Sequence, residues 1–102
     1  MNINGLVFKI KDIIPKDAKS KTVDMGYSKV YLLEIGIDHS LPLTQQRSTL
    51  LHEMLETINT MCDLRLSHTT ISTLETMLYS SLTTNKLLDL KQIDRLLVKG
   101  KG

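Results

Sequence analysis

Two side chains that can bind a metal ion, His52 and Glu56, lie four residues apart within residues 49–59. If this segment is an α-helix, both side chains leave the same face, one turn apart, and can reach one ion. Apolar residues recur at helical spacing beside this polar face, as in an amphipathic helix. The spacing therefore predicts a metal site on a helix, with Glu53 directly after the first ligand.

The order H-E-x-x-E differs from the zinc-peptidase motif H-E-x-x-H only at Glu56, which stands in place of the second histidine. Zinc binds both histidine nitrogen and carboxylate oxygen, and a catalytic zinc site leaves one position for water. Glu53 would take a proton from that water as general base and pass it to a leaving amine. The plain alternative is a surface hydrogen bond between His52 and Glu56, with no metal involved.

A second amphipathic segment, 68–82, carries His68 and Glu75 two turns apart on one face. The connection before it is short, so the two helices should run antiparallel and bring their polar faces together. We expect His68 to be a third zinc ligand. Glu75 could be a fourth ligand, or it could instead hold the second ring nitrogen of a ligating histidine.

The first forty residues read mainly as strands. Residues 5–14 alternate between apolar and polar side chains, and Pro15 should end this strand before a polar loop at 16–22. Residues 27–38 form an apolar run that predicts one further strand. His39 follows in a turn, where we expect no chemical role.

Residues 44–98 read as helices. Thr44 is the expected N-cap of a helix over 45–61, Ser67 that of the second helix, and 86–98 predict a third. The sequence thus predicts one α+β domain over 1–102. A small antiparallel sheet of two to three strands packs on an antiparallel helix pair, and a short C-terminal helix follows.

The composition is ordinary for a globular protein, with 41% hydrophobic and 24% charged residues in a chain of 102. No apolar run approaches the length of a membrane span, so we expect no membrane partner. The single Cys62 suits a reducing compartment, which predicts a cytoplasmic protein. Residues 30–85 carry a net charge of −4 between two segments of +3 each. An acidic centre suits a cation, and nothing in the basic ends specifies nucleic acid.

Several runs resemble a known family: EIGID at 34–38, TLLHE at 49–53, His68, LE at 74–75 and LY at 78–79. They are similar to small phage and prophage proteins related to the H-E-x-x-H metallopeptidases, over roughly residues 27–85. The resemblance implies a zincin-like fold and peptidase ancestry. By position it makes His52 the first ligand, Glu53 the base and Glu56 the second ligand.

Two classes of function follow. One is a zinc-dependent peptidase with Glu53 as base. The other is a non-catalytic phage accessory protein that binds a host or phage protein, in the host cytoplasm if it is phage-encoded. The apolar third helix favours partner binding, including homo-oligomer formation, and the short chain leaves few residues to wall a substrate cleft. Whether the protein is an enzyme is not decided by the sequence.

Overall fold

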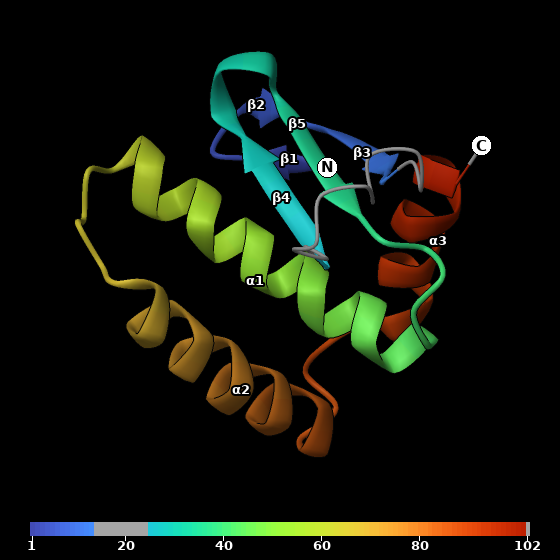
Figure 1. Cartoon of the computed structure of the whole chain (residues 1–102). Coiled ribbons are helices and arrows are strands. Elements are labelled where there is room, and N and C mark those ends of the chain that lie inside the picture. The colour runs from blue at the N-terminus through green and yellow to red at the C-terminus, as the bar shows by residue number, and fades with distance from the viewer. Residues whose placement is uncertain (14–24, 102) are drawn as a thin grey trace.

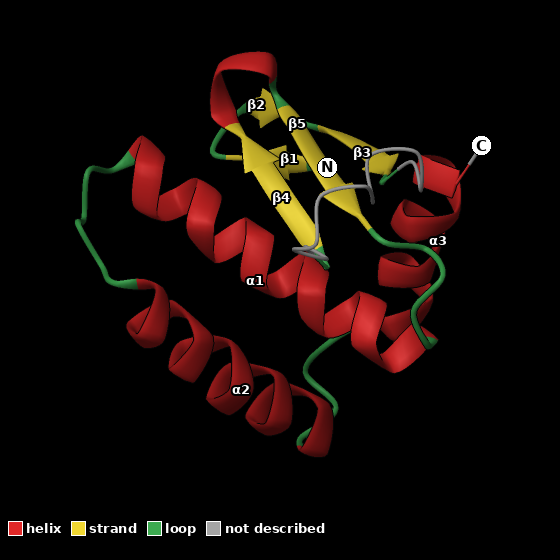
Figure 2. Ribbon diagram, viewed as in Figure 1, coloured by secondary structure: helices red, strands yellow, loops and turns green. Residues whose placement is uncertain are grey.

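We describe the fold from a computed structural model, which describes residues 1–13 and 25–101 (Figure 1). The strands are β1 (Asn2–Ile3), β2 (Leu6–Val7), β3 (Lys9–Asp12), β4 (Gly26–Lys29) and β5 (Glu34–Ile37). The helices are α1 (Leu43–Met61), α2 (His68–Thr84) and α3 (Leu90–Lys101). The predicted α+β class is confirmed, with a sheet, a helix pair and a C-terminal helix (Figure 2). The predicted strand end at Pro15 and the loop at 16–22 lie outside the described residues.

The central sheet is mixed, whereas the sequence predicted antiparallel pairing alone. Strand β5 lies between β3 and β4; it pairs antiparallel with β4 and parallel with β3. A hairpin joins β4 to β5 and therefore makes them antiparallel, but no hairpin joins β3 to β5, so they can pair in the same direction. The β1–β2 hairpin forms a separate antiparallel pair. Strand β4 has β5 as its partner on one side and is an edge of the described sheet.

The predicted single strand over 27–38 is wrong, because a turn divides it. A 3-10 turn, η2 (Val30–Leu32), follows β4, and Leu33 adopts a left-handed conformation with φ of 52° before β5 begins. Val30 and Leu33 pack against the core, while Tyr31 and Leu32 are exposed. Residues 30–33, where the chain turns, contain no Gly, Pro or Asn and so give no local indication of such a turn.

Helix α1 lies between the sheet and α2, and α3 packs along β3 (Figure 2). The buried cluster of the core comprises Ile3, Phe8, Ile35, Ile37, Leu50 and Leu97. Each fully buried side chain of this size stabilises the fold by about 1.5–3 kcal/mol. Within the described residues, no helix is both long enough and apolar enough to cross a membrane.

The two long helices begin close to where the sequence places them. The Ser67 hydroxyl accepts a hydrogen bond from the backbone N–H of Thr70, which confirms Ser67 as the N-cap of α2. The prediction for Thr44 is wrong, because Thr44 lies inside α1 and Pro42 occupies the cap position. Pro42 starts the helix with its carbonyl, which accepts from Gln45 and Gln46. In the figures α1 and α2 run in opposite directions, as predicted (Figure 1).

Helix α3 starts later than predicted, and its apolar side faces inward. The Asp89 carboxylate accepts from the N–H of Gln92, which is the bond of an N-cap and fixes the start at Leu90. Ile93 packs against the core and Leu97 is buried, so this part of the apolar face expected to bind a partner is covered, whereas Leu87 and Val98 are exposed.

Candidate metal centre

Helix α1 carries three side chains of the predicted site: His52, Glu53 and Glu56. Leu50 is buried in the core against the sheet, which fixes how α1 is rotated about its axis. Because successive helical residues are turned by about 100°, neighbouring side chains reach different elements. His52 contacts α2 through Glu75, whereas the carboxylate of Glu53 lies close to Gly26 on β4.

Candidate ligand atoms of His52, Glu56 and His68 converge, since all lie within 4.8 Å of one another. His68 is the first residue of α2. The Ser67 cap, which fixes the start of this helix, therefore also fixes the backbone position from which the His68 side chain extends. The rings of His52 and His68 meet edge to face, with their centroids 5.0 Å apart. Three of the four predicted ligands, from two helices, could therefore hold a metal ion.

Glu75 lies outside this group and contacts the Nδ1 atom of His52. Its Oε1 is 3.1 Å from His52 Nδ1, and its Oε2 accepts a 2.7 Å hydrogen bond from the Ser48 hydroxyl. A carboxylate only accepts, so Nδ1 must carry the proton, and Nε2 keeps its lone pair for a metal. This contact with His52 suits the second of the two roles predicted for Glu75, that of orienting the imidazole ring.

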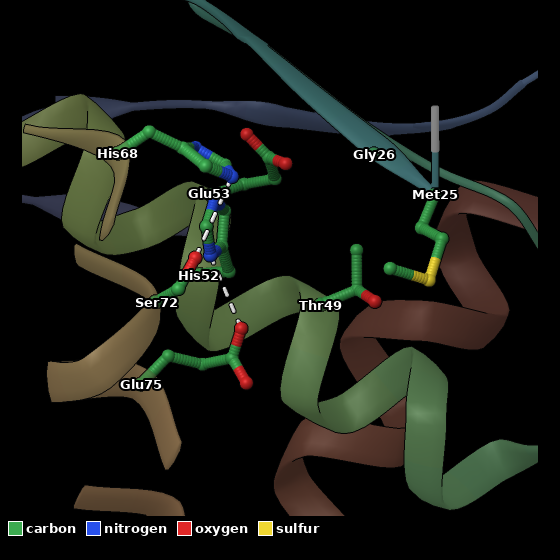
Figure 3. Close-up of a pocket in the computed structure, with 8 residues that line it drawn as sticks. All are labelled: Met25, Gly26, Thr49, His52, Glu53, His68, Ser72 and Glu75. Atoms are coloured by element: carbon green, nitrogen blue, oxygen red, sulfur yellow. Dashed lines mark hydrogen bonds and ion pairs between the residues drawn. The ribbon is translucent and has the colours of Figure 1, made fainter. Parts of the chain in front are cut away.

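A pocket with a volume of about 240 Å³ opens beside these residues (Figure 3). It is lined by Met25, Gly26, Thr49, His52, Glu53, His68, Ser72 and Glu75. Glu53 is 7% exposed and shares the pocket with both histidines. None of these lining residues is Lys or Arg, so the carboxylates of Glu53 and Glu75 make the pocket favourable for a cation.

Strand β4 forms the wall of the pocket opposite α2 because its first residue, Gly26, lets it approach α1 closely. A Cβ atom at Gly26 would lie 2.7 Å from Thr49 Cγ2 and 3.0 Å from Glu53 Oε2. One turn further along α1, the hydroxyls of Ser28 and Thr57 are 2.6 Å apart and hold the strand to the helix. A side chain at position 26 would push β4 away from Glu53.

The donor set fits zinc. Two imidazoles and one carboxylate with an open fourth position match the composition of catalytic zinc sites. Ligand atoms about 2.0–2.1 Å from a tetrahedral ion lie about 3.3–3.4 Å from one another. The limit of 4.8 Å exceeds this separation by about 1.5 Å, which side-chain rotation can supply because His68 is exposed.

No protein-family model, curated protein or solved structure matches the chain. The resemblance to phage relatives of metallopeptidases therefore stays a prediction.

Sequence reasoning placed His52, Glu53, Glu56 and His68 together but missed two supporting residues. Ser48 lies four residues before His52, so helical spacing alone could have put its hydroxyl on the same face. Nothing in the sequence near Gly26 indicates its role. Glycine is needed there because β4 approaches α1 closely, and the contacting residue, Thr49, is 23 positions away in the sequence.

Proposed function

We propose that the chain is a zinc-binding, metallopeptidase-like protein whose centre hydrolyses a peptide bond. The observation that carries the proposal is the convergence of His52, Glu56 and His68 in one group, with Glu53 in the adjoining pocket. The predicted resemblance to phage metallopeptidase relatives and a zincin-like fold agree with this function. A cytoplasmic location is part of this proposal, because the single Cys62 cannot form a disulfide within the chain and suits a reducing compartment.

The residues divide the chemistry among them. His52 Nε2, Glu56 and His68 would hold zinc, which when bound lowers the pKa of a water molecule to about 7 and polarises a carbonyl. Glu53 accepts the proton of the attacking water and returns it to the leaving amine. Glu75 holds the Nδ1 proton of His52, which keeps the ring turned toward the ligand group.

An extended peptide suits the surface beside the pocket. Strand β4 is an edge of the described sheet and begins at Gly26, on the pocket wall. Unpaired N–H and C=O groups of an edge strand can hydrogen bond to a peptide in the manner of an added strand. The backbone of a peptide bound in this way would lie close to the Glu53 carboxylate, because Gly26 and Glu53 line the same pocket.

The proposal is tested by the isosteric substitution Glu53→Gln. Protein purified without added metal should contain about one zinc per chain by elemental analysis, in both the parent and the variant. Hydrolysis of a mixture of unstructured peptides, followed by mass spectrometry, should fall by about 10²- to 10⁴-fold in the variant. Absence of zinc, or undiminished hydrolysis by Glu53→Gln, would refute the proposal.

A second candidate is a non-catalytic phage accessory protein that keeps the fold for binding a host or phage protein. The observation that favours it is the wide uncharged surface of α2. Under this hypothesis Glu53→Gln would leave partner binding unchanged, and zinc-loaded protein would cleave no peptide. Substitution of exposed α2 residues would then be the change that abolishes its function.

A further inference from the structure

The β1–β2 hairpin turns through two residues, Asn4 and Gly5, which face solvent. Ile3 pairs with Leu6 across the turn, so the loop is two residues long. Asn4 has a φ of 50° and Gly5 a φ of 89°, which are the two positive values of a type I′ turn. Both residues are exposed, and a Cβ atom at Gly5 would have no atom beyond the adjacent residues within 4 Å. Water therefore reaches this turn freely.

The glycine after Asn4 makes its side chain the most reactive of the four asparagine amides in the chain. The backbone nitrogen of the following residue can attack the side-chain carbonyl carbon of an asparagine, and glycine hinders this approach least because it has no side chain. The other three asparagines are followed by residues with side chains: Asn2 by Ile3, Asn59 by Thr60 and Asn85 by Lys86.

The Asn4 amide is also held less firmly than the amides of the two helical asparagines. The Asn59 amide donates to the carbonyl of Leu66, and the Asn85 amide donates a 2.7 Å hydrogen bond to the carbonyl of Ser81. Within residues 1–13 and 25–101, the side chain of Asn4 makes no hydrogen bond. Its carbonyl carbon can therefore turn toward the Gly5 nitrogen without breaking a contact.

One contact opposes this reaction. The N–H group of Gly5, whose nitrogen would attack, donates a 2.9 Å hydrogen bond to Asn2 Oδ1. The nitrogen must lose its proton in order to attack, and an amide oxygen is too weak a base to take that proton. While the hydrogen bond is made, it also occupies the position from which a stronger base in solvent would approach. Asn2 therefore protects Asn4 as long as the hairpin is closed.

We propose that Asn4 is a site of spontaneous deamidation, and that Asn2 sets the rate of this reaction in the folded protein. The Gly5 nitrogen forms a bond to Asn4 Cγ and loses its proton to solvent. The bond from Cγ to Nδ2 breaks, and the amide leaves as ammonia. Water then opens the resulting succinimide ring to give either aspartate or isoaspartate. Water is the only co-reactant, and the site is separate from the proposed metal ligands on α1 and α2.

Isoaspartate at position 4 would change the structure of the hairpin. Its backbone continues through the side-chain carbon and is therefore one atom longer, which does not fit the register that a two-residue turn imposes on Ile3 and Leu6. Ile3 is 7% exposed and belongs to the buried core cluster. The β1–β2 hairpin is thus the part of the described fold that this modification disrupts, and with it one edge of the core.

The rate is tested by comparing the parent protein with Asn2→Ala, each both folded and unfolded in urea. Peptide mapping by mass spectrometry, after incubation in mildly alkaline buffer, follows the exchange of the Asn4 NH₂ group for OH. In the folded protein Asn2→Ala should raise the rate by about two- to tenfold, the factor that one ordinary hydrogen bond contributes. In urea both proteins should react equally, because the hairpin is open. Asn2→Asp keeps an oxygen at this position and should react no faster than the parent.

Hydrogen exchange checks that the hairpin of each variant is closed before incubation. The probe is the N–H group of Phe8, which donates a 2.7 Å hydrogen bond to the carbonyl of Met1. Faster modification of Asn59 or Asn85 than of Asn4 would overturn the proposal. So would equal rates for the folded parent and folded Asn2→Ala, or a faster reaction of Asn2→Ala in urea as well.

Asn4→Gly tests the structural consequence. Glycine at both central positions suits a type I′ turn, so the hairpin should form, and there is no side-chain amide to lose. After long incubation the Phe8 N–H should exchange faster in the deamidated parent than before incubation, whereas its exchange in Asn4→Gly should not change. Unchanged exchange in a parent that has been converted to isoaspartate would contradict the predicted loss of the hairpin.

Discussion

Two histidines of this protein, His39 and His52, each have Nδ1 beside a carboxylate, yet they differ in the surroundings of Nε2. His39 is 4% exposed; its Nδ1 lies 3.0 Å from both Asp12 Oδ1 and Ile37 O, and its Nε2 lies 2.7 Å from Leu97 O. His52 has Nδ1 engaged by Glu75 and contributes a ligand atom to the group with Glu56 and His68.

The difference separates a structural histidine from one that can do chemistry. Both ring nitrogens of His39 lie within hydrogen-bond distance of protein oxygens, so neither is available to a metal. It instead ties the ends of β3 and β5 to α3. Burial raises the pKa of Asp12, but the hydrogen bonds from the backbone and ring of His39 outweigh this and hold that pKa below its usual value.

Removing a proposed zinc ligand tests the difference between the two histidines most directly. His68→Ala should lower zinc affinity by more than about a hundredfold, since even outer residues that orient ligands contribute 10- to 100-fold. The apo protein should keep its stability, because the His68 side chain is exposed. Competition with a zinc chelator and urea denaturation measure the two effects. Unchanged zinc affinity would remove His68 from the centre.

The converse result is expected for His39→Ala. Loss of the ring's hydrogen bonds to Asp12, Ile37 and Leu97 should lower the free energy of unfolding by about 2–4 kcal/mol, since one of these bonds is to a carboxylate and the removed side chain, 4% exposed, leaves a cavity. Zinc content of the folded variant should remain at about one per chain. Urea denaturation and elemental analysis check both parts, and loss of zinc from folded His39→Ala would erase the distinction between the two histidines.

Glu75→Gln tests the role of the residue beside His52. It weakens the hydrogen bond to His52 Nδ1 without removing a proposed ligand. The amide accepts less strongly than a carboxylate, so zinc affinity should fall by about 10- to 100-fold. Ser48→Ala should act in the same direction and more weakly, through the lost hydrogen bond to Glu75. If chelator competition shows no change in either variant, Glu75 does not position His52.

The smallest expected change in stability concerns the contact between α1 and α3. It is the second polar contact that holds α3, after that of His39 with Leu97. Arg47 donates two hydrogen bonds of 2.8 and 2.7 Å to Asp94, and this contact lowers the pKa of Asp94 below its usual 3.8. The stabilisation is therefore complete above pH 3.8 and is lost as the pH falls through the lower, folded value.

Asp94→Asn should cost about 1 kcal/mol at pH 7, and the difference from the parent should shrink as the pH falls below 3.8. Urea denaturation at several pH values checks this. A difference that stays constant with pH would show that the Arg47 contact does not govern Asp94.

Much of the helical half follows from local sequence. The spacing around Leu50 and the cap at Ser67 are short-range features, so α1 and α2 could be predicted, and with them the faces that carry His52 and His68. The parallel pairing of β3 with β5 could not, because its partners are distant in sequence and share no hairpin. The role of His39 was missed for the same reason, since Leu97 lies 58 residues away.

X-ray absorption at the zinc edge of stoichiometrically loaded protein tests the central claim most directly. The proposed centre predicts a first shell of nitrogen and oxygen at about 2.0–2.1 Å, with the scattering of two imidazoles. A sulfur neighbour at about 2.3 Å, which only Cys62 or a methionine could supply, or the absence of a one-to-one zinc complex, would contradict it.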